Sequence, residues 1–330
     1  MNQPESRNAV ILVVDGLNAG MLGPYGNTWF ETENFNRLAA RSLVFDFAFT
    51  PSPQVDEMYK AIWNLNQPES TPDLLSSLGK CGVYSTLVSD QDFGKSSDSF
   101  DRVVPIEVEK PKGLADSIED TELANYFAQA LQLLNQVGEQ SGNLYWLHSS
   151  GLFGAWDAPY DLRKQLSDEE DPEPPEFYLP PQGTFDLKSG EPDELLGYQQ
   201  ACSAQVFLLD KFLGFVLDLM DSESWNETLF CLMSSRGFPM GEHGLIGQTS
   251  EPKSTSDTLH NESLHVPLMI SLPNGSGDQA SQPNSVHAIR NGSLVSTEII
   301  SSVVANWFNC LLYTSPSPRD ATLSRMPSSA

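Results

Sequence analysis

The first apolar segment of the chain is a continuous run rich in β-branched residues, Ala9-Val-Ile-Leu-Val-Val14. A run without polar alternation is typical of a strand that is buried on both faces, as at the centre of a parallel sheet. Asp15 follows directly and therefore stands at the carboxyl end of the predicted strand. Open α/β sheets bind ligands outside the carboxyl ends of their strands, which makes Asp15 a candidate functional residue.

Segments with helical and with strand-like patterns alternate along the rest of the chain. The longest helical pattern spans residues 198–220 and carries an apolar stripe formed by Val206, Leu209, Leu213, Val216 and Leu217. The other predicted elements are helices over 35–43, 73–78 and 122–134 and strands over 84–88, 144–148, 229–233 and 268–271. This alternation predicts an α/β fold with a large, mostly parallel sheet sandwiched between helices.

One segment interrupts the alternation, from Ser167 to Glu194. These 28 residues contain six prolines and ten carboxylates against a single lysine. Prolines break regular elements, and a dense run of like charges stays in contact with water. We therefore expect an irregular surface excursion over about 167–194.

Composition and charge narrow the classes of partner. The 330 residues are 39% hydrophobic, which is enough for a core, and 18 basic against 44 acidic residues give a net charge of −26. Such a chain repels phosphate backbones and anionic lipids, so we expect neither nucleic acid nor a membrane as a partner.

The N-terminal segment and the cysteines bear on location. The residues before Ala9 lack the basic region of a signal peptide. The four cysteines have long, irregular spacings without a CxxC pair, which indicates neither a zinc site nor a disulfide framework. We therefore expect a cytoplasmic protein.

The last 21 residues carry a different signal. Residues 310–320 read CLLYTSPSPRD, which is what one reading frame of a common transposase-type sequencing adapter encodes, and residues 324–330 match the continuation of that adapter. We therefore expect residues 1–309 to form the domain and residues 310–330 to be read-through of library DNA. The natural chain would then continue past about Asn309.

Several blocks, in a fixed order, resemble the sulfatase family within the alkaline phosphatase superfamily. They are Val13–Gly16, Leu22–Asn27, Thr32–Arg41, Phe45–Phe49, Tyr198–Thr228 and Gly237–Pro273, the last of which contains the GEHG sequence of residues 241–244. The resemblance implies the alkaline phosphatase/sulfatase-like α/β fold, with a small C-terminal subdomain that we expect this chain to lack. It also implies sulfate ester hydrolysis by a formylglycine made from Cys or Ser, a divalent cation, and Lys, His and Arg around the sulfate.

In the first half of the chain, the residues that this chemistry needs are replaced. The nucleophile position falls on Val55, and the motif's arginine falls on Tyr59. The paired metal-binding acids of the first strand become Asp15 and Gly16. The family's lysine and histidine after the strand over 84–88 align with Asp90 and Asp92, so two anions stand where two cations would hold the sulfate.

The second half shows the same pattern of replacement. The family's catalytic histidine after the strand over 144–148 aligns with Phe153, and the lysine further on aligns with Gln248. Ser235 and Arg236 replace the remaining metal ligands, which leaves Asp15 as the retained ligand. We expect the Arg236 guanidinium to take the place of the cation by a bidentate pair with Asp15.

These replacements leave two function classes open. The first is a catalytically degenerate sulfatase-family protein with a binding or structural role and no cofactor. The second is an active sulfuric or phosphoric ester hydrolase with unorthodox residues, which would use Ca²⁺ or Mg²⁺ and bind a small anionic ester. For the second class, an alignment shifted by three residues would place Ser52 at the nucleophile position.

Other polar residues have a structural and a functional interpretation. Four carboxylates, Asp56, Glu57, Asp90 and Asp92, would either form a different cation site or lie in solvated loops. His148, at a strand end, and His243, in the GEHG block, are interpreted first as structural residues and second as catalytic bases.

The nature of residues 310–330 can be tested on the gene. We predict that the same locus, recovered from an independently prepared library, encodes a different sequence after about Asn309. A native gene that still encodes CLLYTSPSPRD would contradict this interpretation of the chain end.

Overall fold

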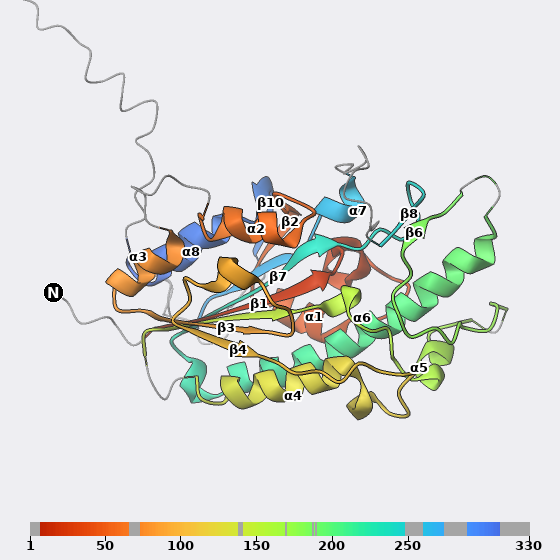
Figure 1. The fold of residues 1–330 in the computed structure, drawn as a ribbon, viewed down its shortest axis with the longest axis horizontal. Helices are drawn as coiled ribbons and strands as arrows, with labels where there is room; N and C mark the ends of the chain where they lie inside the picture. The colour runs from red at the N-terminus through yellow and green to blue at the C-terminus, as the bar shows by residue number, and fades with distance from the viewer. Residues whose placement is uncertain are drawn as a thin grey trace, which may run out of the picture.

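Eight strands form one sheet in the order β10-β2-β9-β7-β1-β5-β3-β4 (Figure 1). The computed structural model describes residues 7–65, 73–137, 141–168, 170–186, 188, 190–247, 260–273 and 289–310. All neighbouring strands are parallel except β9, which is antiparallel to β2 and β7. The strands are β1 (Asn8–Gly16), β2 (Leu43–Phe49), β3 (Tyr84–Ser89), β4 (Arg102–Pro105), β5 (Asn143–Ser149), β7 (Thr228–Gly237), β9 (Leu268–Ser271) and β10 (Ile289–Ser296).

Helices cover both faces of this sheet (Figure 1). One face packs against α1 (Glu33–Ala39), α4 (Glu122–Leu134) and α6 (Pro192–Met220), and the other against α2 (Val55–Ile62), α3 (Leu74–Lys80) and α8 (Ile299–Trp307). Short helices α5 (Tyr160–Gln165) and α7 (Asn261–Leu264) lie in the connections. The predicted fold class, a large and mostly parallel sheet sandwiched between helices, is confirmed.

The apolar run of β1 is buried because the strand lies in the middle of the sheet. Its side chains alternate between two hydrophobic clusters: Val10, Leu12 and Val14 face the side of α4 and α6, while Ala9, Ile11 and Val13 face the side of α2 and α8. Each of these side chains is at most 2% exposed. A strand with a helix layer on each face needs apolar residues at both its odd and its even positions, which explains the absence of polar alternation.

The long helix α6 is joined to α1 by a buried carboxylate. The Asp210 carboxylate of α6 accepts a hydrogen bond from the backbone N–H of Phe35 at 2.8 Å and one from the Asn34 amide at 3.2 Å. The first backbone N–H groups of a helix have no partner within the helix, so a carboxylate there is stabilised by hydrogen bonding and by the helix dipole. This contact fixes α1 against the sheet next to β1.

The predicted surface excursion has little regular structure in the residues that are described. Its one short strand, β6 (Gly183–Thr184), pairs with β8 (Leu245–Ile246). Arg163 of α5, fully buried, donates hydrogen bonds to the carbonyl oxygens of Pro175 and Trp156. The excursion is therefore irregular but attached to the domain by backbone contacts.

Two sequence predictions need correction. The helix predicted over 35–43 ends at Ala39, and Leu43 already begins β2, because the Ser42 hydroxyl bonds the Leu38 carbonyl at 2.7 Å and closes the turn. The sequence also indicated no disulfide, yet Cys81 and Cys310 are bonded, with Cα atoms 6.2 Å apart.

The disulfide was missed because its partners are 229 residues apart and meet only where the ends of α3 and α8 adjoin. Cys310 is also the first residue of the adapter-matching segment, so a natural chain that differs from there onward would lack this bond. Cys202 and Cys231 are buried free thiols.

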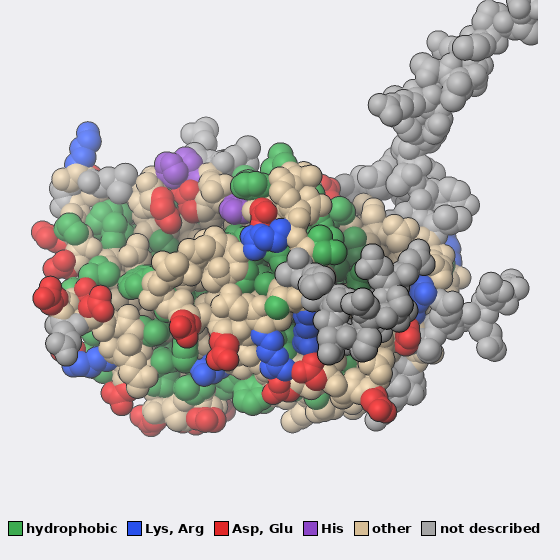
Figure 2. All heavy atoms as spheres, turned by 180° about the vertical axis from the view of Figure 1, so that it is seen from behind, with side chains coloured by type: hydrophobic (Ala, Val, Ile, Leu, Met, Phe, Trp, Pro, Cys, Tyr) green, Lys and Arg blue, Asp and Glu red, His purple; other side chains and the backbone are tan. Residues whose placement is uncertain are grey.

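Acidic side chains are scattered over the face shown in Figure 2, among hydrophobic and uncharged groups. Of the helices formed by the described residues, none is both long enough and apolar enough to cross a bilayer.

Candidate functional site

The carboxyl ends of four adjacent strands bring the candidate residues together. In the order β7-β1-β5-β3, the registers pair Val14 with Ser234 and Ser149, and His148 with Val13 and Ser89. Asp15 and Asp90 directly follow Val14 and Ser89, and Arg236 stands two residues after Ser234. Parallel strands end at one edge of the sheet, so residues from distant parts of the chain converge there.

A buried ion pair occupies the centre of this edge. Arg236 donates from Nε to Asp15 Oδ1 and from a terminal nitrogen to Asp15 Oδ2, both at 2.9 Å. The Ser235 hydroxyl donates a third hydrogen bond to Asp15 Oδ1 at 2.6 Å. The Asp15 side chain is fully buried and that of Arg236 is 10% exposed. The predicted bidentate contact between Arg236 and Asp15 is confirmed.

An aromatic ring closes the ion pair from one side. The guanidinium carbon of Arg236 lies 3.8 Å from the centroid of the Phe153 ring, which is within the range of a cation–π contact. On another side, Arg236 approaches the carbonyl oxygen of Pro53 at 3.4 Å. Val55 and Met58 belong to α2 and pack in the hydrophobic cluster on that face of the sheet. The nucleophile position Val55 thus holds an apolar, half-buried side chain at the start of a helix.

The residues at this edge do not fit the divalent cation that the family resemblance implies. Both carboxylate oxygens of Asp15 already accept hydrogen bonds from a guanidinium, and Ser235 donates to the same group. A second carboxylate at position 16 has no room, because a Cβ on Gly16 would lie 2.9 Å from Leu152 Cβ and 3.1 Å from the Phe153 ring. Gly16 also has φ +85°, which disfavours any other residue.

Asp90 has a structural contact in place of the family's lysine. Its carboxylate accepts from the Ser150 backbone N–H at 2.9 Å and from the Ser150 hydroxyl at 2.7 Å. Ser150 precedes the short 3₁₀ helix η5 (Gly151–Phe153), so Asp90 holds the turn that carries Phe153. Burial raises the pKa of Asp90 to about 6.

The turn also needs Gly151. This residue has φ +51°, and a Cβ there would lie 2.4 Å from the Asp15 carbonyl oxygen. A larger residue would push η5, and with it Phe153, away from the end of β1.

The hypothesis that four carboxylates form a different cation site is wrong for the residues that the structure describes. Asp56 and Glu57 are exposed, and Glu57 pairs with Lys60 at 2.8 Å. Asp92 is exposed and accepts from the backbone of its own turn, from the N–H of Gly94 at 2.8 Å. These groups are not among the described clusters that could hold a metal, since Asp56 and Glu57 lie in the first turn of α2 and Asp92 in a separate turn after β3. Gln248 lies outside the described residues.

Tyr59, which the family resemblance aligned with an arginine, belongs to a buried polar group behind the ion pair. Its hydroxyl is 2.6 Å from His148 Nδ1 and accepts from the Trp146 indole N–H at 3.4 Å. All three side chains are fully buried, and among the described residues His148 Nε2 has no hydrogen-bond partner. Burial lowers the pKa of His148 to about 4, so the ring is neutral at pH 7. A buried neutral imidazole bonded to a tyrosine is the structural role predicted for His148.

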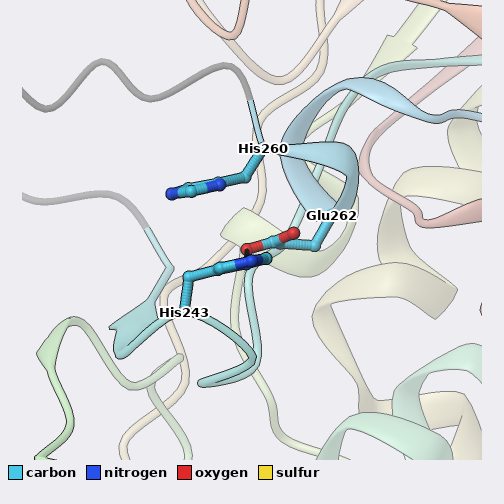
Figure 3. Close-up of side chains that lie close together, drawn as sticks. All are labelled: His243, His260 and Glu262. Atoms are coloured by element: carbon cyan, nitrogen blue, oxygen red, sulfur yellow. Dashed lines mark hydrogen bonds and ion pairs between the residues drawn. The ribbon is translucent and has the colours of Figure 1, made fainter.

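A second cluster was missed by sequence reasoning. His243, His260 and Glu262 lie together at the surface, where the loop after β7 meets α7 (Figure 3). The sequence shows His243 in the GEHG block and both His260 and Glu262 in the later block HNESLHVPL, and gives no spacing that joins the two blocks. His243 bonds the Glu262 carboxylate at 2.6 Å, which is a structural partner for the GEHG histidine.

An open groove of about 300 Å³ adjoins the same side of the molecule. Its walls come from the segments after β1 and β7 and from α6, and they include Asn18, Met21, Trp29, Gln199, Met240 and Glu242. The Trp29 side chain is 45% exposed there, so the groove offers an aromatic surface beside polar groups.

Comparison with known proteins identifies the family. Residues 7–297 match the sequence profile described as Sulfatase. The chain belongs to the sulfatase family. No curated protein sequence matches it significantly.

Solved sulfatase-family and related structures share the fold at low sequence identity. A putative sulfatase from Bacteroides thetaiotaomicron is 14% identical, with a TM-score of 0.66 over 99% of this chain and 76% of that one. The phosphonate monoester hydrolase of Agrobacterium radiobacter is 14% identical, with a TM-score of 0.64 over 92% and 74%. The C-terminal periplasmic domain of EcEptC from Escherichia coli, in complex with Zn, is 13% identical, with a TM-score of 0.66 over 94% and 84%.

In this sulfatase-family fold, removing Arg236 is predicted to be strongly destabilising. Arg236→Ala leaves the buried Asp15 carboxylate without its partner, which costs about 3–5 kcal/mol of unfolding free energy. Arg236→Ala combined with Asp15→Asn should cost less than the sum of the two single changes, as measured by denaturant unfolding. Arg290→Ala is the matched control, because its pair with Asp46 is exposed and contributes about 1 kcal/mol or less. Equal losses in both arginine variants would contradict the assigned importance of the buried pair.

His148 is predicted to lower the stability of the fold at acid pH. Its folded-state pKa of about 4 lies below the unfolded value of 6.5, so the unfolded chain binds a proton first and stability falls as pH drops from 6.5 to 4. The shift corresponds to about 3 kcal/mol. His148→Gln should lose less stability than the natural chain over this window. Tyr59→Phe should lose as much stability as the natural chain, because burial, the main cause of the pKa shift, is unchanged. Thermal unfolding of both variants at several pH values measures these losses.

Proposed function

We propose that this sulfatase-family protein does not hydrolyse sulfate or phosphate esters and that its role is binding or structural. The observation that carries the proposal is the bidentate Arg236–Asp15 pair, which takes both oxygens of the family's one retained metal ligand. A guanidinium neutralises Asp15 but has no open coordination position, so it neither polarises an ester oxygen nor activates a water as a metal ion does.

The demands of the reaction support the proposal. An enzyme must lower the barrier of such a hydrolysis by about 15–20 kcal/mol, and a nucleophile, a cation and basic groups act together to supply this. Here Val55 stands at the nucleophile position, and Phe153 stacks on Arg236 at the place of the histidine. Losses in a unit of cooperating residues are strongly non-additive, so the absence of the nucleophile alone removes most of the rate.

The charges at the edge also oppose an anionic substrate. Asp90 and Asp92 stand where the family's lysine and histidine would contact sulfate. Asp90, with its pKa of about 6, is mainly ionised at pH 7 and repels an incoming sulfate group. The shifted alignment offers Ser52 as a nucleophile, but its hydroxyl accepts a hydrogen bond from the Gln54 backbone N–H at 3.1 Å, and its carbonyl accepts one from the Thr50 hydroxyl.

The binding role is assigned to the open groove beside Trp29. Its ligand would be of a class other than an anionic ester. The cytoplasmic location expected from the sequence stays a prediction, and the similar domain of EcEptC is periplasmic.

The proposal predicts no ester hydrolysis. The purified chain, incubated with an aryl sulfate or an aryl phosphate and with Ca²⁺ or Mg²⁺, should release phenol at the rate of the buffer alone. Asp15→Ala separates a true activity from a contaminant, and Glu227→Ala, an exposed carboxylate just before β7 and therefore at the opposite end of that strand, is the matched control. Turnover that Asp15→Ala abolishes and Glu227→Ala retains would overturn the proposal and favour the active-hydrolase alternative.

A further inference from the structure

Two histidines and one glutamate from different segments share a small surface region (Figure 3). His243 lies in the loop between β7 and β8, His260 immediately precedes α7, and Glu262 lies in the first turn of α7. The two imidazole rings are stacked, with centroids 3.9 Å apart and planes at 6°. One nitrogen of each ring and one oxygen of Glu262 all lie within 4.8 Å of one another.

The nearly buried carboxylate of Glu262 needs a positive charge to compensate it. Its side chain is only 8% exposed, whereas that of His243 is 52% exposed. A buried carboxylate is costly unless a cation or several hydrogen-bond donors face it. Among the described residues, the basic side chain that contacts the Glu262 carboxylate is His243, whose Nδ1 lies 2.6 Å from Oε1. The carboxylate thus depends on one surface imidazole, in a chain that carries a net charge of −26.

The same contact brings a nitrogen and an oxygen ligand together. His243 Nδ1 and Glu262 Oε1 are 2.6 Å apart, so a metal ion bound by both atoms would take the place of this hydrogen bond. A ring nitrogen binds an ion that lies in the plane of its own ring, and the ring of His260 is nearly parallel to that of His243. The His260 ring therefore has to turn to place its nitrogen on the same ion.

We propose that His243, His260 and Glu262 form a binding site for a divalent transition metal of the zinc class. Two imidazole nitrogens and one carboxylate oxygen suit Zn²⁺, whereas Ca²⁺ and Mg²⁺ select oxygen ligands. Ligands at 2.0–2.1 Å from a tetrahedral ion lie about 3.3 Å apart, so His243 Nδ1 and Glu262 Oε1 need to separate slightly and the His260 nitrogen needs to move toward them. The exposure of His243 leaves room for that adjustment and keeps the fourth position open to water.

The site is separate from the Asp15 edge in its residues but linked to it by the backbone. A Cβ on Gly237, the residue after Arg236, would lie 2.0 Å from the Glu262 carbonyl oxygen, so α7 packs directly on the end of β7. A bound ion would connect the loop after β7 to α7 and hold this packing. Glu242, the neighbour of His243, also lines the groove beside Trp29, so the ion would stabilise one wall of that groove.

Zinc titration of the untagged full chain, after removal of metal with a chelator, tests the site. Calorimetry should show one Zn²⁺ per chain with a Kd of about 10 µM or tighter, and neither Ca²⁺ nor Mg²⁺ should compete. His243→Ala and His260→Ala should each weaken zinc binding by at least about tenfold. Glu242→Gln, which changes an adjacent exposed carboxylate outside the cluster, should leave the affinity within about twofold.

A second measurement keeps the test valid if a variant folds poorly. Co²⁺ added to the natural chain should give the visible absorption of a four- or five-coordinate site, and equimolar Zn²⁺ should abolish it. Circular dichroism checks that each variant is folded before titration. Glu262→Gln replaces any alanine variant that is not folded. Zinc binding that is unsaturable at micromolar concentration, or that is equal in the natural chain and the histidine variants, would overturn the proposal. So would loss of binding in Glu242→Gln alone.

Discussion

The buried pair of Asp15 and Arg236 is the interaction on which the carboxyl edge of the sheet depends. A carboxylate with no exposed surface at a central strand end is tolerated only if charge and hydrogen bonds compensate its loss of water. Arg236 supplies both from the adjacent strand, and Ser235 adds a third donor. Phe153 then covers the guanidinium, so the edge is closed by protein groups alone.

The residues around this pair show how a fold persists while its site changes. The two hydrophobic clusters that flank the sheet draw most of their members from inside the strands and helices, although Tyr59 belongs to one cluster and Phe153 packs against the other. The family resemblance aligned Asp90 and Tyr59 with basic groups. In this chain one holds the turn that carries Phe153, and the other packs against His148 and Trp146. The substituted residues have structural contacts of their own.

Two sites beyond the carboxyl end of β7 differ in the partner of their carboxylate. At the Asp15 edge, a guanidinium donates to both carboxylate oxygens and leaves no place for a metal ion. At α7, the Glu262 side chain is 8% exposed and faces the imidazoles that we propose as metal ligands. The difference lies in the partner: an arginine keeps its proton under all ordinary conditions, whereas a histidine does not.

The sequence by itself determined the sheet, the main helices and the pairing partner of Asp15. The apolar run of β1 and the stripe of α6 are local patterns set by burial on known periods. The partner of Asp15 came from the family resemblance, which aligned Ser235 and Arg236 with ligands of the cation that Asp15 would hold. Only the tertiary structure decided which side chains touch across long separations: Phe153 on Arg236, the disulfide of Cys81, and the meeting of His243 with His260 and Glu262. Such contacts depend on how loops and helix ends pack in three dimensions, and no periodicity along the chain records that packing.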